Sequence, residues 1–488
     1  MKLFDRVKGA ADGALAGDGL RAKATRGGAW LGSGSFAEQS SRFVRNMLLT
    51  RLLAPSAFGA MAIVLSSSSL VASFSDVGLW PAVIQNPRGG DDTYLNAAWW
   101  MGVARALFIY AVIFAAAPWI SSFYGNSDLT PLLRVALLST VLDGLLSPRS
   151  KLAHKEMRFS RWAIINNGGG ICGVILTIAL SFILRDVWAL AIGYCSENAF
   201  RCLLSYILFP GLPSLKWDKH AGRDLINFSK GMLGLAFLNL VFTRTDIFVL
   251  GKLYSAGALG VYTMAVFLVQ TPSGFLTNML GATLLPAFSH VQADKERANR
   301  ILSEVTAWMI LLGLPAVAMI WLCRSSLLTI VYGSRYSAGA GALAFAGAVA
   351  LLNSLNALVT TLFFAAGHPA LHRRAVAASA IVMVITIYPA CKLFGLMGGQ
   401  VAALLAITAS YVLQVMRLRG ITGIDLLRYG KAFVPASLIS AGILVAGLSV
   451  HSLGLGVKPL TNIAIDAAIC ILAYGLCVPM FMKIRETA

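Results

Sequence analysis

The sequence predicts an all-α membrane protein with about fourteen transmembrane helices, and three observations carry this prediction. Hydrophobic residues make up 57% of the 488-residue chain and charged residues only 12%, with a mean hydropathy of +0.74. Long apolar stretches recur along the chain, separated by short connections. Lysine and arginine outnumber aspartate and glutamate by 40 to 21 and gather in alternate connections. Because a soluble domain carries about 25% charged residues, this composition excludes a soluble enzyme, a disordered regulator and a secreted disulfide scaffold.

The predicted helices follow from the thickness of a bilayer, whose apolar core of about 30 Å needs about 20 mostly apolar residues per helix. The run at 436–450 is the most clearly apolar, and the first stretch is the least, because it contains Glu38, Arg42 and Arg45. The fourteen stretches are 29–50, 58–78, 95–117, 129–147, 162–183, 187–208, 229–250, 257–285, 302–323, 338–364, 374–394, 397–416, 431–450 and 461–481.

The basic residues predict how these helices are oriented. Of the 40 lysines and arginines, 27 fall in the segments on one side of the predicted membrane and 7 on the other. Since Lys and Arg are enriched on the cytoplasmic side, both termini are predicted to be cytoplasmic, with residues 1–28 as a basic arm. The net charge of +19 then indicates contact with anionic phospholipids rather than with nucleic acid.

A repeated motif predicts two lobes. Residues 45–62 and 244–265 each place an Arg in an apolar stretch, followed by a basic residue, a turn of small residues and another apolar helix. The offset covers six predicted helices, an even number, so the two halves would be related about the membrane normal with a substrate between them. The predicted parts are an N-lobe at 29–209, a cytoplasmic linker at 210–228, a C-lobe at 229–418 and two additional helices within 431–482.

Four segments of the chain carry a family resemblance. They are RLLAPSAFGAMAI (51–63), FSDVGLWPAVIQ (74–85), RTDIFVLGKLYSAGALGVYTMA (244–265) and LLPAFSHVQADKER (284–297). In type and order they resemble the Wzx-type oligosaccharide-lipid flippases of the multidrug/oligosaccharidyl-lipid/polysaccharide (MOP) exporter superfamily. The similarity is greatest to the longer branch that serves exopolysaccharides and colanic-acid-like polymers, and it covers most of residues 25–420.

This resemblance implies a function and a location. The chain would move an undecaprenyl-pyrophosphate-linked oligosaccharide repeat unit across the bacterial inner membrane, from the cytoplasmic to the periplasmic leaflet, for exopolysaccharide, capsule or O-antigen assembly. It would be a transporter working by alternating access, not an enzyme, and a polymerase with its chain-length machinery would be its partners. Two alternatives of the same superfamily stay open: a multidrug or cation antiporter, which would need an acidic cavity, and a lipid II flippase of peptidoglycan synthesis.

Charged side chains inside the predicted helices are the first candidates for a site, since each costs about 2.5–3.5 kcal/mol to insert. Glu38, Arg42 and Arg45 fall on one helical face about 60° wide. Either Arg42 and Arg45 bind an anion, held partly by Glu38, or Glu38 and Arg42 form a structural pair. Arg244 has the place of Arg45 in the second copy of the motif, so both are expected to converge on a pyrophosphate, which suits the planar guanidinium.

Other polar residues and motifs within the apolar stretches have more than one possible role. Glu197 and Arg201 are four residues apart and form either a structural pair or part of a cavity wall, and cavity lining is favoured for Arg105. Asp246 either pairs with an Arg or couples transport to a proton or sodium ion. The motif NNGGG at 166–170 serves either close helix packing or a polar cavity floor. The binding candidates are Arg42, Arg45, Arg105, Arg201, Arg244, Asn166 and Asn167, and the ion-coupling or charge-pairing candidates are Glu38, Glu197 and Asp246.

Cofactor motifs are absent from the sequence. The seven cysteines show no CxxC spacing, the six histidines are scattered, and the phosphate-binding motif GxxxxGK[ST] does not occur. We therefore expect neither a metal nor a nucleotide cofactor. Glu304 and Asp466 lie near the ends of predicted helices, where both are expected to reach water.

Overall fold

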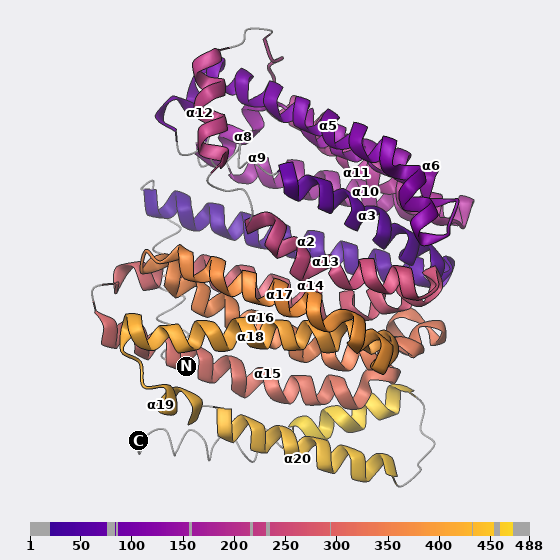
Figure 1. Ribbon diagram of the computed structural model, residues 1–488, viewed down its shortest axis with the longest axis vertical. Helices are drawn as coiled ribbons and strands as arrows, with labels where there is room; N and C mark the ends of the chain where they lie inside the picture. Colours follow the sequence, from indigo (N-terminus) through magenta and orange to yellow (C-terminus); the bar gives the residue numbers. More distant parts are fainter. Residues whose placement is uncertain are drawn as a thin grey trace. The chain divides into compact units, whose positions relative to one another are not determined.

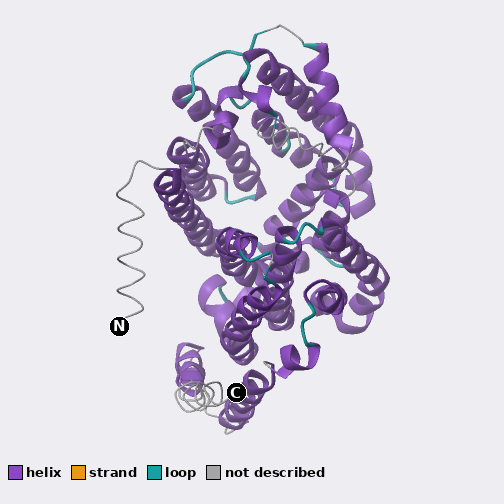
Figure 2. Cartoon of the chain, turned by 90° about the vertical axis from the view of Figure 1, so that its left-hand side faces the viewer, coloured by secondary structure: helices purple, strands orange, loops and turns teal. Residues whose placement is uncertain are grey.

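The computed structural model describes residues 20–75, 83, 86–155, 159–214, 218–230, 235–292, 294–431, 433–452 and 459–471. Every regular element in this part of the chain is a helix (Figures 1 and 2), which confirms the predicted all-α membrane fold. Eight helical stretches within it are long and apolar enough to cross a membrane. Each of the fourteen predicted stretches overlaps at least one helix.

The chain divides into two compact units. Unit 1 consists of Met1–Leu53 and Val64–Phe237, and unit 2 consists of Ala54–Ile63 and Leu238–Ala488. The first turns of helix α3 (Pro55–Ser75) therefore belong to unit 2 and the remainder to unit 1. The predicted repeat and the lobe boundaries stay predictions.

Unit 1 is a bundle in which α10 packs along α11 and α2, while α7 packs on α5 and α11. The predicted stretch 129–147 is not one helix but two, α6 and α7, which meet at Leu137. The elements of unit 1, besides α3, are α2 (Leu20–Leu52), η1 (Pro87–Gly90), α5 (Asp92–Tyr124), α6 (Leu129–Ala136), α7 (Leu138–Gly144), α8 (Pro148–Lys155), α9 (Phe159–Ala163), η2 (Ile164–Gly168), α10 (Gly169–Leu184), α11 (Val187–Leu208) and α12 (Lys219–Lys230).

The segment predicted as a linker packs against the start of α5. Ala221 and Leu225 of α12 are buried in one cluster with Tyr94 and Leu95 of α5. Just before α12, Asp218 accepts hydrogen bonds from the backbone N–H of His220 and from the Arg88 guanidinium at 3.2 Å. The first of these bonds, helped by the second, lowers the pKa of Asp218, so this carboxylate stays ionised at neutral pH.

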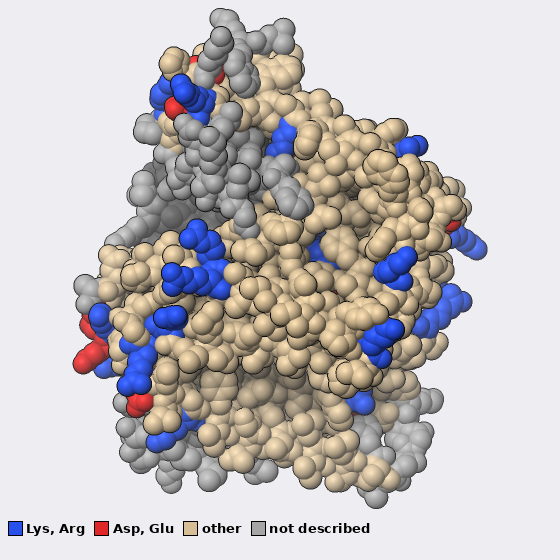
Figure 3. Space-filling view, viewed as in Figure 1, with Lys and Arg blue, Asp and Glu red and all other residues tan. Residues whose placement is uncertain are grey.

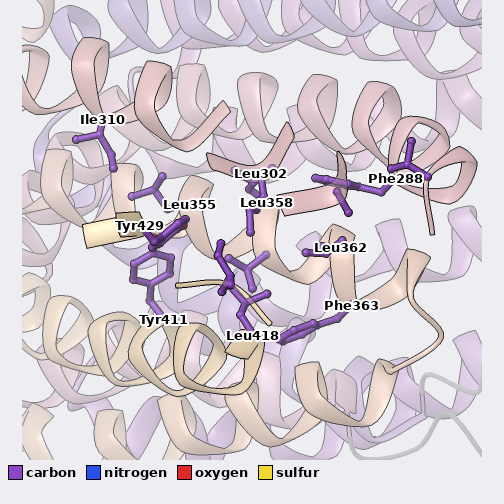
Figure 4. Packing of buried hydrophobic residues seen from close by; sticks show 14 of the residues in the cluster. Phe288, Leu302, Ile310, Leu355, Leu358, Leu362, Phe363, Tyr411, Leu418 and Tyr429 are labelled. Atoms are coloured by element: carbon purple, nitrogen blue, oxygen red, sulfur yellow. The ribbon is translucent and has the colours of Figure 1, made fainter. Parts of the chain in front are cut away.

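Unit 2 is built around α16, which packs against α14, α15 and α18. Figure 4 shows its main core, where Leu355, Leu358 and Phe363 of α16 are buried against Leu302 of α15 and Leu418 of α18. The elements are α13 (Leu235–Leu253), α14 (Ala256–His290), α15 (Lys295–Tyr332), η3 (Ser334–Gly339), α16 (Ala340–Ala365), α17 (Pro369–Phe394), η4 (Gly395–Met397), α18 (Gly398–Thr422), α19 (Leu426–Lys431), α20 (Phe433–Ser452) and a helix at Pro459–Ile471.

The outer surface of unit 2 is apolar along the middle of its helices. Ile381 and Ile385 of α17 and Leu405 and Met416 of α18 are exposed. Figure 3 shows few charged side chains over the middle of these helices, with Lys and Arg toward the helix ends. A surface of this kind suits contact with acyl chains in the middle and with headgroups at the rims.

Two glycines within unit 2 bring α3 and α14 into backbone contact. A Cβ placed on Gly59 would lie 1.9 Å from the carbonyl oxygen of Ala256, and one placed on Gly260 would lie 1.8 Å from that of Pro55. The contact is reciprocal, and both sides of it come from the repeated motif. Small residues permit such close approach between helices in a membrane.

The last described helix contains a buried carboxylate. It packs with α15 and α20 in a cluster that includes Ala318, Ile443 and Cys470, and Asp466 is 0% exposed. The expectation that Asp466 reaches water is therefore wrong, because α15 and α20 cover this helix. Glu304 of α15 is exposed, as expected.

Candidate functional site

Four charged side chains of unit 1 form a closed cluster, named here the ion quartet: Glu38 and Arg42 of α2, and Glu197 and Arg201 of α11. The Oε1 atom of Glu38 lies 3.1 Å from Arg42 Nη2 and 2.9 Å from Arg201 Nη2. The Oε1 atom of Glu197 lies 2.8 Å from Arg201 Nη2 and also contacts Arg42 Nη2. Each guanidinium thus bridges both carboxylates, and the formal charges of the quartet cancel.

The quartet lies in the interior of unit 1. The Glu197 side chain is only 2% exposed, and those of Glu38, Arg42 and Arg201 are 18–25% exposed. Taking charges out of water is costly unless partners and hydrogen bonds replace the lost hydration. The cross-linked arrangement provides both, which explains how four ionised groups are accommodated at this depth.

Helix α10 makes room for the quartet because it presents glycine where its neighbours carry the charges. A Cβ on Gly169 would lie 2.4 Å from Arg201 Cγ, and one on Gly173 would lie 2.6 Å from Glu197 Cβ. A Cβ on Gly170 would lie 3.2 Å from the Glu38 carboxylate. Both α2 and α11 can therefore approach α10 closely enough for their side chains to meet across it.

The NNGGG motif starts in a short π-helix, η2, directly before α10. The main-chain carbonyl of Asn166 accepts a hydrogen bond from Arg201 Nε at 3.3 Å. The Asn167 side chain packs on α2, where a Cβ on Gly34 would lie 2.0 Å from its amide nitrogen. Single π-helical turns inside α-helices are frequent at functional sites. Here the turn serves helix packing and at the same time positions one arginine of the quartet.

Both Glu–Arg pairs anticipated from the four-residue spacing are present, but the bonds that join them were not anticipated. The segments EQSSR (38–42) and ENAFR (197–201) have the same Glu-x-x-x-Arg pattern. That shared pattern is the signal in the sequence that two complementary pairs are available to cross-link two helices.

Arg45 lies on α2, as do Glu38 and Arg42, but it has a different hydrogen-bond partner. Its Nε donates to Asn46 Oδ1 at 3.3 Å. Among the residues that the structure describes, no carboxylate lies within salt-bridge distance of it. Its side chain is partly buried. Arg45 is therefore the guanidinium near the quartet whose charge is not balanced by an adjacent acid.

Arg105 has another neighbour within unit 1. This residue of α5 donates from Nη2 to the main-chain carbonyl of Ala72 in α3 at 3.3 Å. Its side chain is partly buried. No ion pair within the described part of the chain joins it to the quartet.

Unit 2 contains a second buried polar group, around Asp246 of α13. Tyr262 of α14 donates its hydroxyl to Asp246 Oδ2 at 2.6 Å, and Gln400 of α18 donates from Nε2 to the Tyr262 oxygen at 2.7 Å. All three residues are buried. Gln400 Oε1 has no hydrogen-bond partner in the described part of the structure. Neither Tyr262 nor Gln400 could be selected from the sequence, since a neutral side chain in an apolar stretch is a site candidate only once a carboxylate is known to lie beside it.

Of the two roles considered for Asp246, the structure does not show an ion pair with an arginine among the described residues. Within the described residues of unit 2, no basic side chain lies within salt-bridge distance of its carboxylate. Arg244, two residues before it, is partly buried and has no ion-pair partner among the described side chains. Arg45 and Arg244 belong to different units, and their convergence stays a prediction.

Metal-binding geometry is not found in the described residues, where no group of three or more His, Cys, Asp or Glu side chains is close enough to hold an ion. The polar side chains described above are guanidinium groups, amides and carboxylates, of which Glu197 in unit 1 and Asp246 in unit 2 are buried.

Comparison with known sequences relates the chain to one family. The family described as "Polysaccharide biosynthesis protein" matches residues 48–340. The lipopolysaccharide biosynthesis protein WzxC of Escherichia coli strain K12 is 21% identical over 71% of this chain and 70% of its own length. The succinoglycan biosynthesis transport protein ExoT of Rhizobium meliloti strain 1021 is 22% identical over 61% of this chain and 60% of its own length.

Comparison with solved structures relates the whole fold to that of a known transporter. The lipid II flippase MurJ in its inward closed conformation superposes with a TM-score of 0.76, covering 93% of this chain and 98% of that one at 11% sequence identity. At this identity the likeness concerns the fold alone, and it agrees with the multi-helix architecture predicted from the apolar stretches.

Proposed function

This chain belongs to the polysaccharide biosynthesis protein family, and we propose that it is a flippase that carries a lipid-linked oligosaccharide across the bacterial inner membrane. Its substrate would be an undecaprenyl-pyrophosphate-linked repeat unit, destined for exopolysaccharide, capsule or O-antigen assembly. The chain is a multi-pass membrane transporter rather than an enzyme, of the Wzx type within the MOP superfamily. The lipid carrier, the inner membrane and the cytoplasmic termini are parts of the proposal.

The unbalanced charge of Arg45 is the observation that carries this proposal. A pyrophosphate that crosses the membrane must exchange its hydration for donors inside the protein, because a charge without partners is costly there. Guanidinium groups bind phosphate oxygens with two parallel hydrogen bonds. Arg45 provides such a group beside the quartet without an acid to neutralise it. We assign it as the primary contact to the diphosphate.

The other predicted residues are proposed as further contacts to the substrate. Arg42 and Arg201 are two further diphosphate ligands, and Glu38 and Glu197 balance their charges. Asn166 and Asn167 line the site near the sugar, and Arg105 and Arg244 are further contacts for the anionic headgroup. A polymerase with its chain-length machinery and anionic phospholipids are the proposed partners.

Asp246 is the proposed ion-coupling carboxylate of unit 2. It is buried, its partner is the Tyr262 hydroxyl rather than a cation, and the oxygen of Gln400 beside it is unpaired. A carboxylate in such surroundings can bind and release a proton or a sodium ion without first breaking an ion pair. Replacing it by Asn should abolish the dependence of transport on an ion gradient while substrate binding remains, which binding and gradient-driven transport measured on the same sample would separate.

A multidrug or cation antiporter is the alternative function on this fold. It would require a net negative site for organic cations. In the described part of unit 1 the charges around α10 sum instead to one excess guanidinium, since the quartet is neutral and Arg45 is unbalanced. A lipid II flippase would share the anionic headgroup and differ in the sugar.

The proposed function is tested by replacing Arg45 with Ala in cells that depend on this chain for polymer export. We expect surface polymer to fall about tenfold to a hundredfold, the loss expected from one charge-assisted hydrogen-bonding group worth about 1.5–3 kcal/mol. The lipid-linked precursor should accumulate in the cytoplasmic leaflet. Arg45→Lys should recover part of the export if charge alone is needed.

The matched control is Arg51→Ala, which removes an exposed guanidinium from the last turn of the same helix. It should export polymer at the wild-type level, with all variants present in the membrane in equal amounts. Wild-type export by the Arg45→Ala variant would contradict the assignment of the diphosphate contact.

A further inference from the structure

We propose that unit 2 binds the saccharide of the substrate through three side-chain amides, named here the amide strip: Asn239 of α13 and Gln270 and Asn278 of α14. Their donors and acceptors would pair with the hydroxyl groups of the sugars. This assignment rests on the proposed function and adds to it the residues that recognise the sugar rather than the diphosphate.

Two of the three amides lie at the middle of predicted transmembrane stretches. Asn239 is at the centre of the stretch 229–250, and Gln270 is next to the centre of the stretch 257–285. The middle of such a stretch is expected at the middle of the bilayer core, where lipid provides no hydrogen-bond partner.

The alignment of α13 and α14 places these two amides at the same level. The helices are joined by only two residues, so they run in opposite directions, and the hydrogen bond from Tyr262 to Asp246 fixes how they are aligned. Asn239 comes seven residues before Asp246, and Gln270 comes eight residues after Tyr262. Both therefore lie about 11 Å farther along the helices, on the side away from the connection.

Helix α14 has two exposed faces of different character. On one face, Leu276 and Met279 are 55% and 57% exposed, which suits contact with acyl chains. On the roughly opposite face, Gln270, Gly274 and Asn278 are exposed, and at about 100° per residue they fall within about 80° of the helix circumference. A face with two amides and a glycine at this depth is suited to water or a polar ligand rather than to lipid.

The amides of the strip have no hydrogen-bond partner among the residues that the structure describes. Only the main-chain carbonyls of Gln270 and Asn239 are engaged, by the hydroxyl groups of Ser273 at 3.2 Å and Thr243 at 2.9 Å. Asn and Gln side chains in membrane helices usually bond to a neighbouring helix, because an amide in hydrocarbon without a partner is costly. The strip therefore offers its hydrogen bonds to a molecule outside the described chain.

Neutral amides match the hydrogen bonding of a saccharide better than that of a phosphate. Each amide has an accepting oxygen and two N–H donors, and each sugar hydroxyl both donates and accepts. Phosphate oxygens only accept, and charged guanidinium groups are the stronger donors to them. Gly274 leaves room for a ring between Gln270 and Asn278, since a Cβ placed on it would meet nothing within 4 Å.

The test compares the affinities of the full-length protein in detergent for two kinds of farnesyl diphosphate diester, measured by calorimetry. The second ester group is glucose, galactose or N-acetylglucosamine in the sugar diesters and methyl in the other, so all carry the same charge. The wild type should bind at least one sugar diester more tightly than the methyl diester. Gln270→Met and Asn278→Leu should each weaken that sugar diester about twofold to tenfold, as expected for one neutral hydrogen bond, and leave the affinity for the methyl diester unchanged.

A steric variant and a control complete the test. Gly274→Leu adds a side chain where the described chain leaves open space. It should keep the thermal stability and the affinity for the methyl diester, but weaken the sugar diester about fivefold or more. The control Thr283→Val changes an exposed residue on another side of α14, whose hydroxyl donates to the Met279 carbonyl of the same helix at 3.0 Å. It should bind both diesters as the wild type does.

Three results would overturn the amide strip, and they differ in what they mean for the proposed function. If the wild type binds all the diesters equally, the strip is wrong and the diphosphate substrate stands. The same holds if Gln270→Met, Asn278→Leu and Gly274→Leu all retain the full preference for the sugar diester. If the wild type binds no diester, the diphosphate substrate is wrong and the strip falls with it. The first and last results come from the wild type alone, so the test holds even if a variant fails to fold.

Discussion

Arg42 and Arg45 lie three residues apart on α2, yet among the described residues only Arg42 has carboxylates beside its guanidinium group. Arg42 bridges two carboxylates and is neutralised, whereas Arg45 contacts only the side chain of Asn46 among its described neighbours. A buried ion pair is weak evidence for stability, but removing one partner alone leaves an uncompensated charge. At the scale of single residues, the charge of Arg42 is balanced by two acids and that of Arg45 is not, which is why Arg45 is the proposed contact to the substrate.

The quartet predicts that removing one charged residue destabilises the protein more than removing a Glu–Arg pair together. Replacing Arg201 alone with Met should lower the free energy of unfolding by about 3–5 kcal/mol, because Glu197 loses a partner inside the protein. Replacing Glu197 and Arg201 together should cost less than either single change, since Glu38 and Arg42 remain as a balanced pair. Denaturation in mixed micelles measures all three variants. A double variant as unstable as the sum of the single variants would show that the four groups do not act as one cluster.

Helix α10 is the element on which the site depends, because its glycines set the distance between α2 and α11. An alanine substitution at Gly173 of α10 has a matched control at Gly168, the last residue of η2. A Cβ on Gly173 would lie 2.6 Å from Glu197 Cβ, but one on Gly168 would meet nothing closer than Leu204 Cδ1 at 3.5 Å. Gly173→Ala should therefore lower the free energy of unfolding by about 1–3 kcal/mol and also reduce transport.

Gly168→Ala should leave both the stability and the transport rate near those of the wild type, since the added methyl group meets ordinary packing. Thermal unfolding and polymer export measured on the same preparations check the pair. Equal effects of the two substitutions would mean that helix propensity, and not the space beside Glu197, governs these positions.

How much of this could be predicted from sequence depends on the element. Among the described residues, hydropathy located the long apolar helices, because burial in lipid demands a long apolar stretch, but it marked the apolar part rather than the helix ends. It did not locate the short polar helices, such as α8 and α12. Helix α2 begins at Leu20 instead of residue 29, and the stretch 129–147 breaks into two helices at Leu137. The two Glu–Arg pairs followed from helical spacing. Their cross-links, and the contacts of Tyr262 and Gln400 with Asp246, depend on which helices pack together, which spacing along one chain does not contain.

At the scale of the whole molecule, the distribution of charge is a prediction about topology. Most of the 40 Lys and Arg residues fall on one side of the predicted helices, and that side is expected to be the cytoplasm. Reporter fusions after residues 215 and 488 should both give a cytoplasmic signal, and a fusion after residue 185 an external one. An external signal at 215 or 488 would overturn the orientation, and with it the proposed direction of transport.

The central claim is that buried guanidinium groups recognise a diphosphate during transport, and it is tested most directly in proteoliposomes. The measurement compares the transfer rates of two lipids with the same polyprenyl chain and the same oligosaccharide, joined in one by a diphosphate and in the other by an uncharged ether. Oxidation of the exposed sugar by a membrane-impermeant reagent reports arrival in the outer leaflet. We expect the diphosphate lipid to move and the ether lipid to stay at the protein-free rate, with Arg45→Ala moving the diphosphate lipid about tenfold to a hundredfold more slowly. Equal transfer of both lipids by the wild-type protein would contradict the account.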